Sequence, residues 1–139
     1  FETMYNNNGI GLAAVQVGVL RRMIVIDVSK KDEEKNPFCL INPVIKSFGK
    51  DRLTYEEGCL SIPETFIEIE RPKTCIVEYV DISGNKTNME CDGLLSTCIQ
   101  HEINHLDGKL IIDFLSKLKK DILIKKLSKN KNTSSRVIV

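Results

Sequence analysis

Apolar residues in the first two thirds of the chain form short runs or alternate with polar residues, a pattern typical of β-strands. Met23–Val28 is an apolar run rich in Ile and Val, broken only by Asp27, and it predicts a strand. Phe66–Glu70 alternates apolar and acidic residues, as a half-buried strand does. Phe38–Ile45 predicts a pair of strands interrupted at Asn42-Pro43, because proline has no N–H to donate to a ladder.

A β-hairpin is predicted in the middle of the chain. Thr74–Asp81 and Lys86–Cys91 have strand-like patterns, and they flank the turn-forming sequence Ser83-Gly84-Asn85. Near the start of the chain, Gly9–Gly18 is rich in glycine and alanine and is interpreted as a loop.

The last third of the chain changes to helical patterns. Asp92-Gly93 is expected to open a helix that continues to about His105 and ends at Gly108. A second helix is predicted from about Phe114 to Ser128, followed by a polar, frayed end. Phe1–Tyr5 resembles the end of a helix whose beginning is missing, so an N-terminal segment is expected to precede this sequence.

Strands followed by helices predict an α+β fold, and 139 residues without repeats predict a single domain over residues 1–139. A net charge of +1 predicts no overall attraction to nucleic acid or membrane, and no apolar run approaches transmembrane length. Five cysteines without regular spacing favour a reducing compartment. The abundance of Lys, Ile and Asn suggests an AT-rich genome, so a bacterial cytoplasm is expected, with an organelle as the alternative.

The only two histidines of the chain lie in Gln100–Gly108, which reads Gln-His-Glu-Ile-Asn-His-Leu-Asp-Gly. Positions i and i+4 share one face of a helix, so His101 and His105 can bind one metal ion. Glu102 lies beside them and can exchange a proton with a metal-bound water. The motif therefore predicts a metallohydrolase, for which a metallopeptidase is one reading.

A catalytic metal usually has three protein ligands, and the third is left open by this motif. No Glu or His follows His105, which argues against the two commonest peptidase versions. Asp107, Asp113 and Asp121 remain formally possible. Cys59 is the better candidate, although spacing alone cannot bring it to the helix.

Three stretches of the chain resemble the signature motifs of the peptide deformylase family. They occur in the family's order and with its separations, and the resemblance covers nearly the whole chain. The stretches are Gly-Ile-Gly-Leu-Ala-Ala-Val-Gln at 9–16, Glu-Gly-Cys-Leu-Ser at 57–61 and Gln-His-Glu-Ile-Asn-His at 100–105. The resemblance implies antiparallel β-sheets packed around a central metal-binding helix.

It also implies an activity and a cofactor. The expected reaction is hydrolysis of the N-formyl group from the formylmethionine of newly synthesised proteins, which releases formate. Cys59, His101 and His105 would hold one divalent metal, with Fe²⁺ expected in the cell and Ni²⁺, Co²⁺ or Zn²⁺ possible in preparations. One thiolate and two imidazoles suit such a borderline ion.

Further residues take roles by the same resemblance. Glu102 would be the general base and acid, and the Gln16 side chain with the Leu60 backbone N–H would stabilise the charge on the formyl oxygen. Arg71 matches a position near the family's substrate site, and Glu57 is expected to pair with it.

The substrate contacts are expected from the backbone and from one helix face. The peptide should lie along Ile10-Gly11 as an added strand, with Gly9 and Gly11 allowing close approach. Leu94 and Cys98 precede His101 at helical spacing and can form an apolar pocket for methionine, with Ile10 opposite. Plain core packing is an equal interpretation for Leu94.

Three positions depart from the family pattern. Asn104 replaces the usual Asp, which removes a negative charge next to the ligands. Val15 replaces a Pro or Thr, and Phe66 replaces an Arg that the family often carries near the substrate.

The end of the chain is strongly basic. From Lys109 onward, nine basic residues face two acidic ones, a net +7, which leaves −6 for residues 1–108. The predicted helix and tail at about 114–139 would therefore suit a polyanion, and some family members dock on the ribosome with such a helix. A solvated helix face is the alternative, and a catalytically inactive ribosome-associated protein is a further reading of the whole chain.

Overall fold

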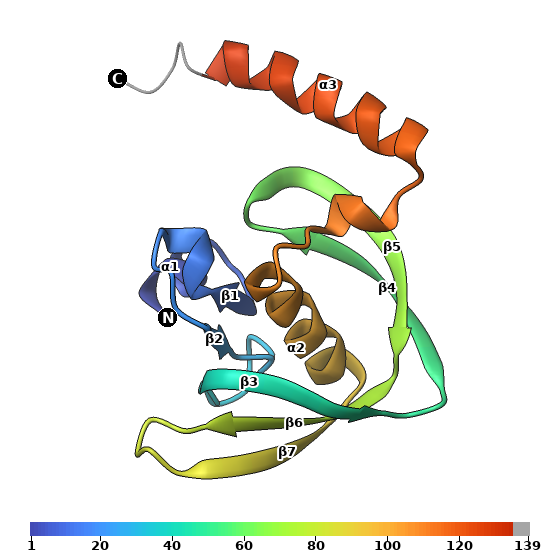
Figure 1. Ribbon diagram of the computed structural model, residues 1–139. Helices are drawn as coiled ribbons and strands as arrows, with labels where there is room; N and C mark the ends of the chain where they lie inside the picture. Colours follow the sequence, from blue (N-terminus) through green and yellow to red (C-terminus); the bar gives the residue numbers. More distant parts are fainter. Residues whose placement is uncertain (135–139) are drawn as a thin grey trace.

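The computed structural model describes residues 1–134, and it has two β-sheets with one helix between them (Figure 1). The polar end predicted to fray after Ser128 is helical as far as Ser134, and its remainder at 135–139 lies outside the described residues. In chain order the elements are α1 (Glu2–Asn6), β1 (Gly11–Ala13), the 3₁₀ helix η1 (Ala14–Val17), β2 (Met23–Ile26), β3 (Phe38–Phe48), β4 (Arg52–Cys59), β5 (Ile62–Pro72), β6 (Thr74–Val80), β7 (Lys86–Asp92), α2 (Gly93–Leu106), the 3₁₀ helix η2 (Ile111–Phe114) and α3 (Lys117–Ser134).

The two sheets are antiparallel and confirm the α+β prediction. The larger sheet has the strand order β1-β2-β3-β6-β7, and β4 pairs with β5 in a separate two-stranded sheet. Figure 1 shows α2 in the middle of the molecule, with the five-stranded sheet on one side and β4–β5 on the other. The predicted hairpin is β6–β7, and the predicted first helix of the last third is α2.

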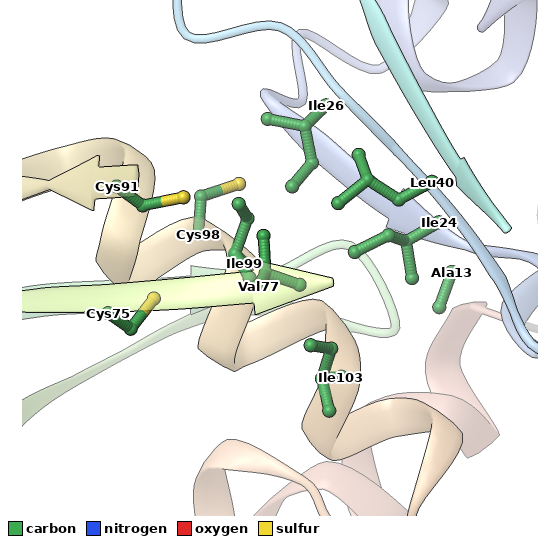
Figure 2. Close-up of a cluster of buried hydrophobic side chains, with 10 residues drawn as sticks. All are labelled: Ala13, Ile24, Ile26, Leu40, Cys75, Val77, Cys91, Cys98, Ile99 and Ile103. Atoms are coloured by element: carbon green, nitrogen blue, oxygen red, sulfur yellow. The ribbon is translucent and has the colours of Figure 1, made fainter. Parts of the chain in front are cut away.

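The main core lies where α2 packs against the five-stranded sheet. Alternation along β2 turns Ile24 and Ile26 inward, and both are fully buried. Ile24 is paired with Leu40 on β3, and Ile99 of α2 packs into the same cluster. Figure 2 shows these apolar side chains meeting between the helix and the strands. The α2 face that carries the metal motif is therefore held in place by its opposite face, which is apolar.

The prediction of two strands at Phe38–Ile45 is wrong, because β3 continues through this region to Phe48. The pairing between β3 and β6 shifts register between Ile41 and Val44, where Asn42 takes a left-handed φ of 51°. This β-bulge accommodates Pro43, since the residues at the shift make no regular ladder bond. The Asn42 N–H instead donates to the Arg22 carbonyl at 2.8 Å.

The interpretation of Gly9–Gly18 as a loop is also wrong in part. The segment contains β1, which pairs with β2 through Gly11–Ile26 and Ala13–Ile24, and then the single turn η1. Its small residues gave no strand pattern, yet they allow the backbone to approach α2 closely. This three-residue strand forms one edge of the sheet.

The second helix begins later than predicted. Phe114 belongs to η2, and α3 starts at Lys117, because Leu115 is extended and Ser116 accepts a hydrogen bond from the Lys119 N–H. Leu123 and Leu127 of α3 pack on an apolar cluster formed by β5 and η2. No helix in the described part of the chain has the length and apolar character needed to cross a membrane.

Candidate metal centre and substrate pocket

The two histidines of α2 converge on one point, as their spacing predicts. His101 and His105 are buried, and their Nε2 atoms lie 3.2 Å apart. A helix places i and i+4 side chains on the same face, so no further element is needed to bring them together.

Cys59 completes the cluster from the end of β4. The register between β4 and β5 shifts between Gly58 and Cys59, and the Cys59 Sγ lies 3.3 Å from the His105 Nε2. The candidate ligand atoms of Cys59, His101 and His105 all lie within 4.8 Å of one another, and no other such group occurs in the described residues. The alternative ligands Asp107, Asp113 and Asp121 do not belong to this cluster.

The electrostatics of the cluster favour a thiolate. Burial alone would raise the pKa of Cys59, but hydrogen bonds with His101 and His105 lower it to about 6. Burial would also lower the pKa of His101, but hydrogen bonds with Cys59 and Glu57 raise it to about 9. A cation that binds here would displace the imidazole proton. One sulfur and two nitrogen donors fit a borderline divalent metal, which agrees with the expected ligand set.

Glu57 fixes the orientation of His101. The Glu57 carboxylate lies 2.9 Å from the His101 Nδ1, which leaves the Nε2 of the ring for the metal. Arg71 binds the same carboxylate with two hydrogen bonds of 2.6 and 3.0 Å, so the predicted Glu57–Arg71 pair is confirmed. Burial alone would raise the pKa of Glu57, whereas the hydrogen bonds with His101 and Arg71 lower it.

Arg71 itself does not lie where a substrate contact was predicted. Its guanidinium is buried behind Glu57, donates to the Asn104 Oδ1 at 2.8 Å, and lies 4.8 Å from the centre of the Phe114 ring. Arg71 does not line the substrate pocket. Asn104 therefore receives a hydrogen bond where an Asp would have added a second negative charge to Arg71.

Breaking the Glu57–Arg71 pair is expected to be costly, because Arg71→Met removes the guanidinium and both of its hydrogen bonds from a buried carboxylate. The expected loss in the free energy of unfolding is about 3–5 kcal/mol. Urea unfolding measures it, with Arg22→Met as the control. Arg22 pairs with Asp107 at 3.0 Å, but both side chains are nearly half exposed. Such a pair contributes about 0–1 kcal/mol, so equal losses in the two variants would contradict the prediction.

Glu102 is a buried carboxylate that lacks a hydrogen-bond partner for one oxygen. It is 4% exposed, and its Oε2 has no partner among the described residues. Burial raises the pKa of Glu102 to about 7, despite the opposing effect of His101 and His105. A carboxyl group with this pKa can both accept and return a proton near neutral pH.

Gln16 is oriented by its own backbone. Its side-chain oxygen accepts from the Ala13 N–H at 2.9 Å, so its NH₂ group faces the Ser61 Oγ at 2.9 Å and the Cys59 Sγ at 3.8 Å. Val15, a departure from the family pattern, packs against the core beside it. The amide donor of Gln16 is therefore held next to the metal ligands.

A pocket of about 550 Å³ opens beside the cluster, between the edge of β1 and the β4–β5 sheet. Most of the predicted substrate and catalytic residues line it. They are Gly9, Ile10, Gly11, Gln16, Leu60, Leu94, Cys98 and Glu102. Ile10 and Leu94 are each 40% exposed, so Leu94 is a pocket residue rather than plain core.

Among the other residues that line the pocket, three bear on the sequence predictions. Tyr55 and Thr97 were not predicted, and Phe66 is 65% exposed at its rim. Thr97 lies three residues after Leu94 and four before His101, so helical spacing from the motif would have found it. No sequence signal identifies Tyr55, because β4 had no clear pattern.

A buried carboxylate beside a three-ligand cluster, open to a pocket, is the arrangement with which metallohydrolases activate water. Comparison with known proteins identifies the family. The family model described as polypeptide deformylase matches residues 1–121. The peptide deformylase of Pelagibacter ubique is 56% identical over 138 residues, 99% of this chain and 79% of that protein. The peptide deformylase of Bartonella henselae is 53% identical, over 99% of this chain and 80% of that protein.

A solved structure agrees. The crystal structure of peptide deformylase from Ehrlichia chaffeensis superposes with a TM-score of 0.89 at 41% identity, over 96% of this chain and 80% of that one. The chain belongs to the polypeptide deformylase family, a family of metal-dependent hydrolases that act on formylated nascent peptides.

Proposed function

We propose that this chain removes the N-formyl group from the N-terminal formylmethionine of newly synthesised proteins and releases formate. One observation carries the proposal: Glu102, a buried carboxyl group with one unpartnered oxygen among the described residues, lines a pocket together with Cys59 and His101, two of the three candidate metal ligands. Hydrolysis needs a base at this place and a group that can return the proton to the leaving amine. The family membership of the chain supports the choice of substrate.

The residues of the site divide the work of the reaction. A divalent ion held by Cys59, His101 and His105 would lower the pKa of water and polarise the formyl carbonyl. Glu102 accepts the proton of the attacking water and later delivers it to the amine of methionine. The Gln16 amide and the Leu60 backbone N–H donate to the formyl oxygen as negative charge develops on it.

The substrate lies along the edge of β1 in this proposal. Backbone groups of Ile10 and Gly11 pair with the peptide as with an added strand, which accepts many sequences. Ile10, Leu94 and Cys98 enclose the methionine side chain. Arg71 acts through Glu57 and does not contact the substrate, a revision supported by its buried position.

Fe²⁺ is the proposed metal, because a thiolate and two imidazoles suit a borderline ion. Ni²⁺, Co²⁺ or Zn²⁺ would occupy the same ligands in some preparations. Elemental analysis of protein purified without air tests this choice, and a stoichiometric content of zinc in place of iron would overturn it.

The experiment that tests the activity uses formyl-Met-Ala-Ser. The purified holoenzyme should release formate from this peptide and no free amino acid. Amino acid release would favour a metallopeptidase, and no product at all would favour a protein that only binds.

The basic helix α3 supports a further proposal on partners. Lys117, Lys120 and Lys125 lie on α3, which extends beyond the body of the molecule (Figure 1). We propose that it contacts the ribosome, so that the enzyme meets nascent chains in the bacterial cytoplasm. Co-sedimentation with ribosomes at low and high salt tests it, because charge-driven binding weakens with salt.

A further inference from the structure

The segment along which the substrate is proposed to lie is hydrogen-bonded to one residue, Asp27. β1 is the edge strand, and Ile10 immediately precedes it. The Ile10 carbonyl accepts from the N–H of Asp27, the residue that follows β2, at 2.9 Å, and from the thiol of the pocket residue Cys98 at 3.6 Å. The backbone of Asp27 therefore extends the β1–β2 ladder by one bond, to the residue where the peptide is proposed to lie.

The side chain of Asp27 makes a second connection. Its carboxylate is 3% exposed and accepts from the Tyr5 hydroxyl at 2.6 Å. It also accepts from the Ser29 hydroxyl at 2.6 Å and the Ser29 N–H at 3.0 Å. Burial would raise the pKa of Asp27, but the hydrogen bonds from Ser29 and Tyr5 lower it to about 2, so the group is ionised.

Tyr5 belongs to α1, which has only five residues. A helix of this length is not stable alone, so its position depends on tertiary contacts. Three contacts are evident: Met4 is fully buried, Tyr5 is bound to Asp27, and the Lys35 ammonium lies 4.8 Å from the centre of the Tyr5 ring. The Met4 carbonyl in turn accepts the Gly9 N–H at 2.9 Å.

Asp27 thus binds the chain on both sides of Asn8 and Gly9. Its side chain holds α1 before them, and its N–H holds Ile10 after them. Asn8 has a left-handed φ of 55°, a conformation that asparagine tolerates and that turns the chain between α1 and Ile10. The geometry points to Asp27 as a positioning residue for substrate binding, which with Tyr5 fixes the wall formed by Asn8, Gly9 and Ile10. This inference rests on the proposed placement of the peptide along Ile10 and Gly11.

The test compares Tyr5→Phe and Asp27→Asn with the unchanged holoenzyme on two substrates. Formyl-Met-Ala-Ser can pair with the strand edge, whereas N-formylmethionine has almost no backbone to pair. Both variants should lower kcat/KM for the tripeptide by about three- to tenfold, the factor of one hydrogen bond, mainly through KM. The kcat/KM for N-formylmethionine should fall much less. The ratio of kcat/KM for the tripeptide to kcat/KM for N-formylmethionine should therefore decrease.

The matched control is Tyr79→Phe. It also deletes a tyrosine hydroxyl, but from β6, a strand of the sheet that contains β1 and β2. It should leave the tripeptide preference unchanged. If Tyr5→Phe and Asp27→Asn lower both substrates by the same factor, their effect is only on folding and the inference is overturned. Unchanged preference would also overturn it, and Tyr5→Phe gives the answer even if Asp27→Asn fails to fold. If the unchanged enzyme has no tripeptide preference, the proposed placement of the peptide fails first.

Discussion

Replacing Glu102 with glutamine is expected to lower turnover by at least about 10²–10⁴-fold, the usual contribution of general acid–base catalysis. Glutamine keeps the shape of the side chain but cannot accept a proton. The ligand atoms of Cys59, His101 and His105 are untouched, so the metal content should not change. The Glu102 Oε2 has no partner to lose, so the variant should also fold normally.

Formate release, metal analysis and unfolding on one preparation test this expectation. Glu90→Gln is the control, because it removes the same charge from an exposed position on β7. A Glu102→Gln protein without metal would make the carboxylate structural. Normal turnover would place the proton transfer on another group.

Cys59→Ser is the second change with a large expected effect. A serine hydroxyl is a weak ligand at neutral pH, whereas the pKa of Cys59, about 6 despite its burial, already favours the thiolate that metals bind. The variant should lose most of its metal and, with it, nearly all activity. The two histidines remain, so weak residual binding is expected.

Metal titration followed by formate release measures both losses. Cys39→Ser provides the matched control, because Cys39 is a partly buried cysteine on β3 outside the cluster. Full metal content and full turnover in Cys59→Ser would show that Cys59 is not a ligand.

The sequence predictions are accurate where the interactions are local, and less accurate where they join segments far apart in the chain. The His101–His105 pair is local, since helical geometry alone joins positions i and i+4. Cys59 lies at the end of β4, in the two-stranded sheet, far from α2 in the sequence. The family resemblance was therefore needed to select it from the open alternatives. The position of Arg71 outside the pocket depends on how β5 packs beside α2, which no local pattern records.

The errors in the fold have the same origin. β3 continues past Pro43 because a bulge formed with β6 absorbs the proline. β1 is a strand because β2 pairs with it, although its own residues have little preference for strands. By contrast, β2 and α2 were predicted well, because an apolar run rich in Ile and Val marks β2, and turn residues at both ends and the spacing of its histidines mark α2.

Gly9 and Gly11 line one side of the pocket, and this limits the substitutions by which the enzyme can evolve. A β-carbon at Gly11 would lie 2.6 Å from the Glu102 Oε1 and 2.7 Å from the Cys98 Sγ. Even the smallest substitution at this position therefore displaces the Glu102 carboxylate or the Cys98 thiol. The opposite wall is built from the side chains of Tyr55 and Phe66, and Phe66 has open space around it. Point mutations can therefore reshape substrate preference at pocket positions that carry exposed side chains, such as Phe66, Ile10 and Leu94, but not at Gly11.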